Sequence, residues 1–256
     1  VRLCHAPPRR LPVVQCAAVA ELCKQRFGCA PGEARLVEEK LPAAPWFNLA
    51  TANSRCDSLK DRLRLSEASL QAVVMARPAV LGLSYEDTVA PALRKLQIRL
   101  RMDDEQLHRV VVKLPQVLGY SYEANVEPTL DQLQSRLGLG ERQLQKLVLG
   151  YPQVLGLSYE ANLRPKLYFM EAELGLSPQS LRESIVSRPA RLGYSLERRY
   201  RPRLRACRQA GADVEAVLRL AARTDASFCQ TIGLPLEEYA ACRSGLEVEH
   251  ETEARY

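Results

Sequence analysis

The sequence of 256 residues has no long uncharged run, few histidines and no nucleotide-binding motif. Its longest uncharged run, from Leu41 to Ser54, has 14 residues, and the next, from Leu147 to Tyr159, has 13, whereas a membrane-spanning helix needs about 20 apolar residues. The three histidines, His5, His108 and His250, form no HExxH motif, and no phosphate-binding loop or dinucleotide fingerprint occurs. The sequence therefore predicts no membrane span, no enzymatic activity, no catalytic residue and no cofactor.

Paired cysteine motifs are also absent, although the chain has eight cysteines. Without a CxxC pair, and in a chain too large to need disulfide staples, the cysteines are expected to be reduced thiols in an intracellular compartment. Cys4, Cys16, Cys23 and Cys29 cluster near His5. A zinc site there is an alternative, but the spacing fits no common ligand pattern. We therefore predict no metal.

Basic residues outnumber acidic ones outside the end of the sequence. The net charge is +6, and the last twelve residues carry four glutamates and one arginine, a net of −3, so the other 244 residues carry +9. Such an excess suggests a polyanionic partner. The first 20 residues hold Arg2, Arg9 and Arg10 and no acid, which fits the remnant of an organelle-targeting segment or a basic arm of the mature protein.

A 37-residue repeat organises the middle of the chain. Prolines at positions 78, 115, 152 and 189 stand 37 residues apart, and a second series with this spacing begins at Pro91. Self-similarity at a fixed period is the signature of a repeat architecture. The copies align without a gap and read RPAVLGLSYEDTVAP, LPQVLGYSYEANVEP, YPQVLGLSYEANLRP and RPARLGYSLERRYRP.

Each repeat is predicted to contain two helices. After the second proline, apolar residues recur at helical spacing, as at Leu93, Leu96 and Leu100, which places an apolar stripe on one helix face. A shorter helix precedes the first proline, and Leu107 and Val110 mark it in one copy. The pattern thus predicts tandem helix pairs.

The segment between the two prolines predicts how the longer helix begins. A serine in each copy can accept hydrogen bonds from free N–H groups at the helix start, and the glycine two residues earlier is expected to adopt a left-handed conformation. A proline inside a regular helix costs about 3 kcal/mol. The second proline therefore marks either a compensated bend or the true helix start. The serines are Ser84, Ser121, Ser158 and Ser195, and the glycines are Gly82, Gly119, Gly156 and Gly193.

Tandem helix pairs bury their apolar faces by stacking on one another. The sequence therefore predicts an all-α fold, a curved α-solenoid superhelix of 37-residue helical repeats. Cys56, Cys207 and Cys229 fall in slots held by leucine or methionine in other copies, so we expect them in the core. The predicted organisation is a basic N-terminal arm (1–35), a degenerate repeat (36–69), four repeats (70–217), C-terminal capping helices (218–246) and an acidic tail (247–256).

The repeat signature resembles that of the mitochondrial transcription termination factor (mTERF) family. The resemblance rests on the four strings above, on the leucine pattern of 130–139 and 167–176, and on the closing stretch DASFCQTIGLPLEEY. It covers residues 36–243. It implies mTERF-type repeats, residence in mitochondria or chloroplasts, and nucleic-acid binding through a basic groove. Members of the family act on organellar DNA, introns, ribosomal RNA or ribosome assembly.

Basic residues independently indicate binding of phosphates. The stretch 188–208 holds eight arginines against Glu197, a net of +7. Other cations share slots between repeats, which would align them on one face. Tyr85, Tyr122 and Tyr159 occupy a fixed slot that favours packing between repeats over base stacking. The predicted nucleic-acid-binding residues are Arg77, Arg99, Arg109, Lys113, Arg136, Lys146, Arg164, Lys166, Arg188, Arg191, Arg198, Arg199, Arg201, Arg203, Arg205 and Arg208.

Three functions agree with these features. The chain binds structured RNA, ribosomal RNA above all, as a structural or assembly component of an organellar ribosome; or it is a DNA-binding regulator or terminator of organellar transcription; or it is a protein-binding scaffold. The short array favours RNA, whose folded hairpins are compact, shape-read targets. The expected location is the mitochondrial matrix, with the chloroplast stroma as the alternative, and the expected partner is a large ribonucleoprotein assembly.

Overall fold

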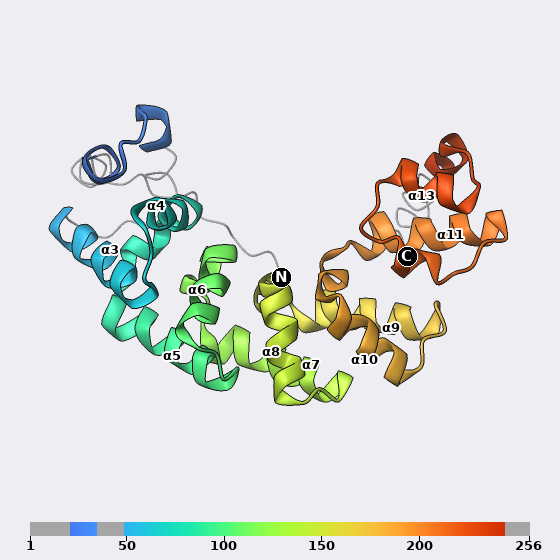
Figure 1. Ribbon diagram of the computed structural model, residues 1–256, viewed down its shortest axis with the longest axis horizontal. Coiled ribbons are helices and arrows are strands. Elements are labelled where there is room, and N and C mark those ends of the chain that lie inside the picture. Colours follow the sequence, from blue (N-terminus) through green and yellow to red (C-terminus); the bar gives the residue numbers. More distant parts are fainter. Residues whose placement is uncertain (1–20, 35–48, 244–256) are drawn as a thin grey trace, which may run out of the picture. The chain divides into compact units, whose positions relative to one another are not determined.

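The computed structural model describes residues 21–34 and 49–243, and every regular element within these ranges is a helix (Figure 1). The predicted all-α repeat fold is therefore confirmed. The first 20 residues, residues 35–48 and residues 244–256 lie outside the described ranges, and with them Cys4, Cys16, His5 and the acidic tail. The chain divides into two compact units, Val1–Leu130 and Asp131–Tyr256.

The first unit holds helical segments at 21–27 and 31–34, a degenerate repeat, the first repeat and most of the second. The elements from the degenerate repeat through the first repeat are α3 (Leu49–Leu63), α4 (Glu67–Ala76), η1 (Pro78–Gly82), η2 (Tyr85–Val89) and α5 (Ala90–Arg99). Those of the second repeat are α6 (Asp104–Lys113), η3 (Pro115–Gly119), η4 (Tyr122–Val126) and α7 (Glu127–Leu137), whose first residues belong to this unit.

The second unit holds the rest of α7, the third and fourth repeats and a C-terminal module at 216–243. The third repeat comprises α8 (Glu141–Gly150), η5 (Pro152–Gly156), η6 (Tyr159–Leu163) and α9 (Arg164–Ala172), and the fourth comprises α10 (Pro178–Ser187), η7 (Pro189–Gly193), η8 (Leu196–Tyr200) and α11 (Arg201–Ala210). The module comprises α12 (Ala216–Arg219), α13 (Asp225–Ile232) and helical residues 236–243. Helices α4, α6, α8 and α10 are termed the first helices, and α5, α7, α9 and α11 the second helices.

The apolar stripes predicted from the repeat form the core of each unit. Leu93, Leu96 and Leu100 are buried at the second helix of the first repeat, and the equivalent residues of the other repeats are buried too, except the exposed Gly211 in the slot of Leu100. The predicted core positions of Cys56, Cys207 and Cys229 are confirmed, since all three are buried as free thiols. These positions bury apolar surface between helices, which is the main source of stability in such repeats.

The N-terminal helical residues pack against the degenerate repeat rather than extending as an arm. Arg26 Nη2 lies 2.7 Å from Asp57 Oδ1 of α3 and 3.4 Å from Glu67 Oε1 of α4. The Gln71 side-chain amide donates to the Phe27 carbonyl at 3.3 Å. Residues 21–34, which belong to the predicted arm (1–35), therefore pack against α3 and α4 through Arg26 and Phe27.

The four serines cap the longer helices as predicted. Each hydroxyl accepts a hydrogen bond from the backbone N–H three residues later, which satisfies one of the free donors at a helix start. Ser177 also caps α10, with Pro178 at the first helical position, where a missing N–H costs nothing. These caps are local, so they follow directly from the repeat sequence.

A wide helical turn accommodates the second proline of each repeat. In the first repeat, the Ala90 N–H donates to the carbonyl of Tyr85, five residues earlier, and Pro91 follows as the second residue of α5. This spacing is π-helical. In a regular α-helix the proline ring would clash with the carbonyl four residues earlier. The wider turn moves that carbonyl away from the ring. The helix thus runs continuously from the serine cap through the proline, and the turn recurs in all four repeats.

The predicted left-handed conformation of the repeated glycines is wrong. None of Gly82, Gly119, Gly156 and Gly193 has a positive φ. At two of them the structure shows a close approach instead: a Cβ on Gly119 would collide with the Arg77 guanidinium, and one on Gly193 with the Tyr151 ring. Arg77 and Tyr151 each precede the first proline of the previous repeat. The glycine therefore leaves room for packing between repeats.

Candidate nucleic-acid interface

Several cations on the second helices are neutralised by carboxylates of the protein. Arg136 pairs with Glu171, Arg164 pairs with Glu160, and Arg201 Nη1 lies 3.3 Å from Glu173 Oε1. The hydrogen bond that Arg136 donates to the Glu171 carboxylate raises the pKa of Arg136. Exposed pairs of this kind add little stability, but they reduce the charge that these three predicted site residues offer to a phosphate.

Five cations on the first helices or directly after them have no partner among the described residues. Arg109 and Lys113 lie exposed in the last two turns of α6, and Lys146 lies exposed near the end of α8. Arg188 is exposed directly after α10, and Arg77, directly after α4, is half-buried with its Nε unbonded. Within the described ranges, none of these five side chains has an ion pair or a hydrogen bond.

Arg203 belongs to the protein interior, which corrects its predicted exposure to nucleic acid. Its side chain is fully buried. The guanidinium donates to the carbonyls of Leu220 at 2.6 Å and Arg223 at 2.8 Å, pairs with Asp225 Oδ1 at 2.9 Å, and lies 4.5 Å from the centroid of the Phe228 ring. All four partners belong to the C-terminal module, so Arg203 holds this module against α11.

Two further arginines of the 188–208 stretch bind the same module. Arg199 Nη1 donates to the carbonyls of Ala221 at 2.9 Å and Arg223 at 3.0 Å, and its guanidinium lies over the Tyr194 ring. Arg191 donates to the Leu218 carbonyl at 3.4 Å and to the Ser184 carbonyl at 2.9 Å. Burial lowers the pKa of Arg191, and nearby Arg188 lowers it further. Much of this arginine stretch is therefore structural.

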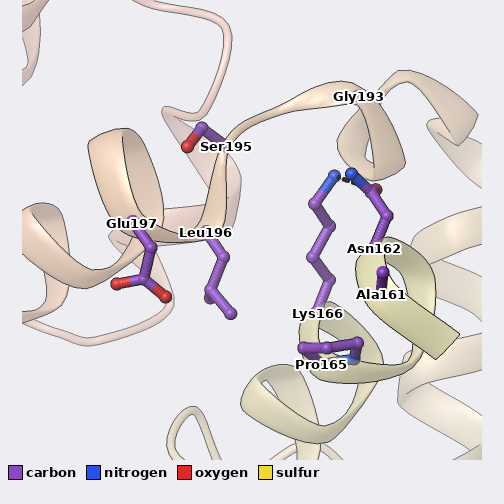
Figure 2. A pocket seen from close by; sticks show the side chains of 8 residues that line it. All are labelled: Ala161, Asn162, Pro165, Lys166, Gly193, Ser195, Leu196 and Glu197. Atoms are coloured by element: carbon purple, nitrogen blue, oxygen red, sulfur yellow. Dashed lines mark hydrogen bonds between the residues drawn. The ribbon is translucent and has the colours of Figure 1, made fainter. Parts of the chain in front are cut away.

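Lys166 is buried between the third and fourth repeats, which also corrects a predicted phosphate contact. Its ammonium group donates to the Leu192 carbonyl at 2.6 Å and to Asn162 Oδ1 at 2.7 Å. Figure 2 shows both side chains pointing toward the turn at Gly193. Burial lowers the pKa of Lys166. The lysine lines a cavity of about 480 Å³ without offering its charge to the surface.

The remaining predicted residues fall into two groups. Arg99 and Arg205 are half-buried and have contacts within the protein. Arg198 and Arg208 are exposed and have no partner among the described residues. Some other exposed cations are also unpaired within the described ranges but were not predicted to bind nucleic acid. These are Arg94, Arg142, Arg219 and Arg223. One of them, Arg94, shares its slot in the repeat with the predicted residue Arg205, which was a signal for it.

Polar groups around the cavity are occupied by structural contacts. The Ser195 hydroxyl accepts from the Arg198 N–H at 3.0 Å, and Glu197 accepts from Arg201 Nε at 3.1 Å.

Histidine and cysteine side chains away from the cavity are also held in structural positions. His108 Nδ1 lies 2.7 Å from the Leu63 carbonyl. Burial raises the pKa values of Cys56 and Cys207 to about 11, which makes these thiols poor nucleophiles.

Residues 21–34 and 49–243 contain no cluster of three or more histidine, cysteine, aspartate or glutamate side chains arranged to hold a metal ion. No helix in the same ranges is both long and apolar enough to cross a bilayer. The alternative zinc site is not settled by this observation, because Cys4, Cys16 and His5 lie outside the described ranges.

These features define an all-α repeat protein with unpaired cations along its first helices. A model of the mTERF family matches residues 51–228, more than half of the chain, so the chain belongs to the mTERF family. Proteins of this family are organellar, in mitochondria or chloroplasts, and are generally non-enzymatic nucleic-acid-binding proteins. A search of curated proteins found no significant match to the sequence.

Proposed function

We propose that the chain binds structured RNA, ribosomal RNA above all, as a non-enzymatic structural or assembly component of an organellar ribosome. Membership of the mTERF family supports nucleic-acid binding in an organelle. The observation that carries the proposal is the set of unpaired, exposed cations on the first helices, at Arg109, Lys113 and Lys146. Such cations release counterions from a phosphate backbone without cost to an existing ion pair.

Folded RNA is the favoured target because it presents compact shapes that proteins recognise largely through shape and backbone contacts. The acid-free, arginine-containing first 20 residues support the mitochondrial matrix as the location.

Crosslinking in purified organelles, followed by sequencing of the bound nucleic acid, tests this proposal. We expect ribosomal RNA to dominate the recovered sequences. Recovery of genomic DNA would instead select the transcriptional regulator. If neither is recovered and co-purifying proteins are, the chain is a scaffold and the proposal is wrong.

A further inference from the structure

We infer that the phosphate backbone crosses the C-terminal ends of the first helices. This inference rests on the proposed function and adds the face of the repeats at which binding occurs. It starts from the distribution of charge along each first helix. Acidic residues lie at the N-terminal ends, as in Asp104 and Glu105 of α6, and cations lie at the C-terminal end, as in Arg109 and Lys113.

Part of this polarity recurs in the other repeats of each unit. In the first unit, α4 has Glu67 in its first turn, Arg77 follows its last residue, and the Arg77 guanidinium reaches Gly119 at the end of η3 in the next repeat. In the second unit, α8 has Glu141 in its first turn and Lys146 in its C-terminal half, whereas α10 has no acidic residue in its first turn and is followed by Arg188. Cations at the C-terminal end of a helix are also stabilised by the helix dipole.

Packing brings the cations of neighbouring repeats close together. Helices α4 and α6 are in contact, and so are α8 and α10. Packed helices lie about 8–10 Å apart, so cations at matching ends of neighbouring helices are within reach of one strand of nucleic acid. Each unit thus presents its own row of cations, which we name the first-helix row: Arg77, Arg109 and Lys113 in the first unit, and Lys146 and Arg188 in the second.

The second helices are less suited to this role because several of their cations are already neutralised, as at Arg136 and Arg201. A phosphate approaching Arg136 or Arg201 would have to displace Glu171 or Glu173. It would also be repelled by the carboxylate that it displaced. The fourth repeat interrupts the row once, since the exposed Glu183 occupies the slot of Arg109 and Lys146.

Two variants with equal loss of charge test the assignment. One removes three cations of the first-helix row, by Arg109→Gln, Lys113→Gln and Lys146→Gln. The control removes three exposed cations outside the first helices, by Arg94→Gln, Arg219→Gln and Arg223→Gln, which also lack partners among the described residues. Circular dichroism should show unchanged helicity for both variants, because none of these side chains is buried.

Binding of a fluorescein-labelled RNA stem-loop is measured by anisotropy over a salt series. We expect the slope of log affinity against log salt to fall in magnitude by about 2 to 3 for the first-helix variant, which is about one for each lost phosphate contact. The control should stay within about 1 of the wild type. An equal or larger fall in the control would overturn the assignment, while salt-independent binding of the wild-type chain would overturn the proposed function itself.

Discussion

The ammonium group of Lys166 donates to the carbonyl oxygen of Leu192, joining the second helix of the third repeat to the end of η7 in the fourth. Arg55 binds the Leu81 carbonyl in the same way, three periods earlier in the same slot of the repeat. Carbonyls at the end of a helix lack intrahelical donors. A cation from the preceding repeat therefore supplies the missing donor at these two boundaries.

Replacing Lys166 by methionine keeps most of the side-chain volume but removes the donor. We expect the free energy of unfolding to fall by about 1–3 kcal/mol, because the Leu192 carbonyl is left without this partner. Urea denaturation measures the change. Arg164→Met, which removes an exposed ion pair two residues away, should cost no more than about 1 kcal/mol. Equal losses for the two variants would show that the contact contributes nothing specific.

The lowered pKa of Lys166 predicts a dependence of stability on pH. Burial lowers the pKa of this group in the folded chain, so in the window between the lowered pKa and the unfolded value, about 10.4, the unfolded chain binds more protons. Stability therefore rises with pH across that window. Urea midpoints measured toward alkaline pH should increase for the wild type relative to Lys166→Met, and parallel pH profiles would refute the prediction.

The contact between Gly193 and Tyr151 predicts a paired effect of two substitutions. Gly193→Ala alone should destabilise the protein by about 1–3 kcal/mol, since the added Cβ meets the tyrosine ring. Tyr151→Leu, which installs the residue found at position 114 in the same slot, should relieve that clash. A double-mutant cycle from thermal or urea unfolding measures the coupling. Additive effects would contradict the packing seen here, and Gly32→Ala, with open space around its Cβ, is the control.

Arg203 predicts a local effect on the C-terminal module. Arg203→Met removes the donor to the Leu220 and Arg223 carbonyls and leaves Asp225 with the weaker partner Arg243. Loss of one member of such a buried network costs about 3–5 kcal/mol. Hydrogen exchange should accelerate most within residues 216–243. The control is Arg198→Met, five residues earlier and exposed without a partner among the described residues. Uniform acceleration across the second unit would refute a module-specific role.

Local features of the fold could be predicted from the sequence because they depend on residues close in the chain. The apolar stripes and the serine caps each involve neighbours within a few positions, the 37-residue period repeats them along the chain, and the structure confirms all three. The π-helical turn before Pro91 was harder to predict from the sequence. A bend and a helix start place the proline in nearly the same sequence context, and the hydrogen-bond spacing alone distinguishes them.

The sequence by itself thus determined the helices, their repetition and the membership of the family. Only the tertiary structure decided what each cation does. Arg198 and Arg203 stand five residues apart in one basic stretch, yet the first is exposed and the second is buried against carbonyls 17 and 20 residues away. The physical reason is that a cation's role depends on which carboxylates and carbonyls other repeats bring to it, and residue type and slot do not encode those neighbours.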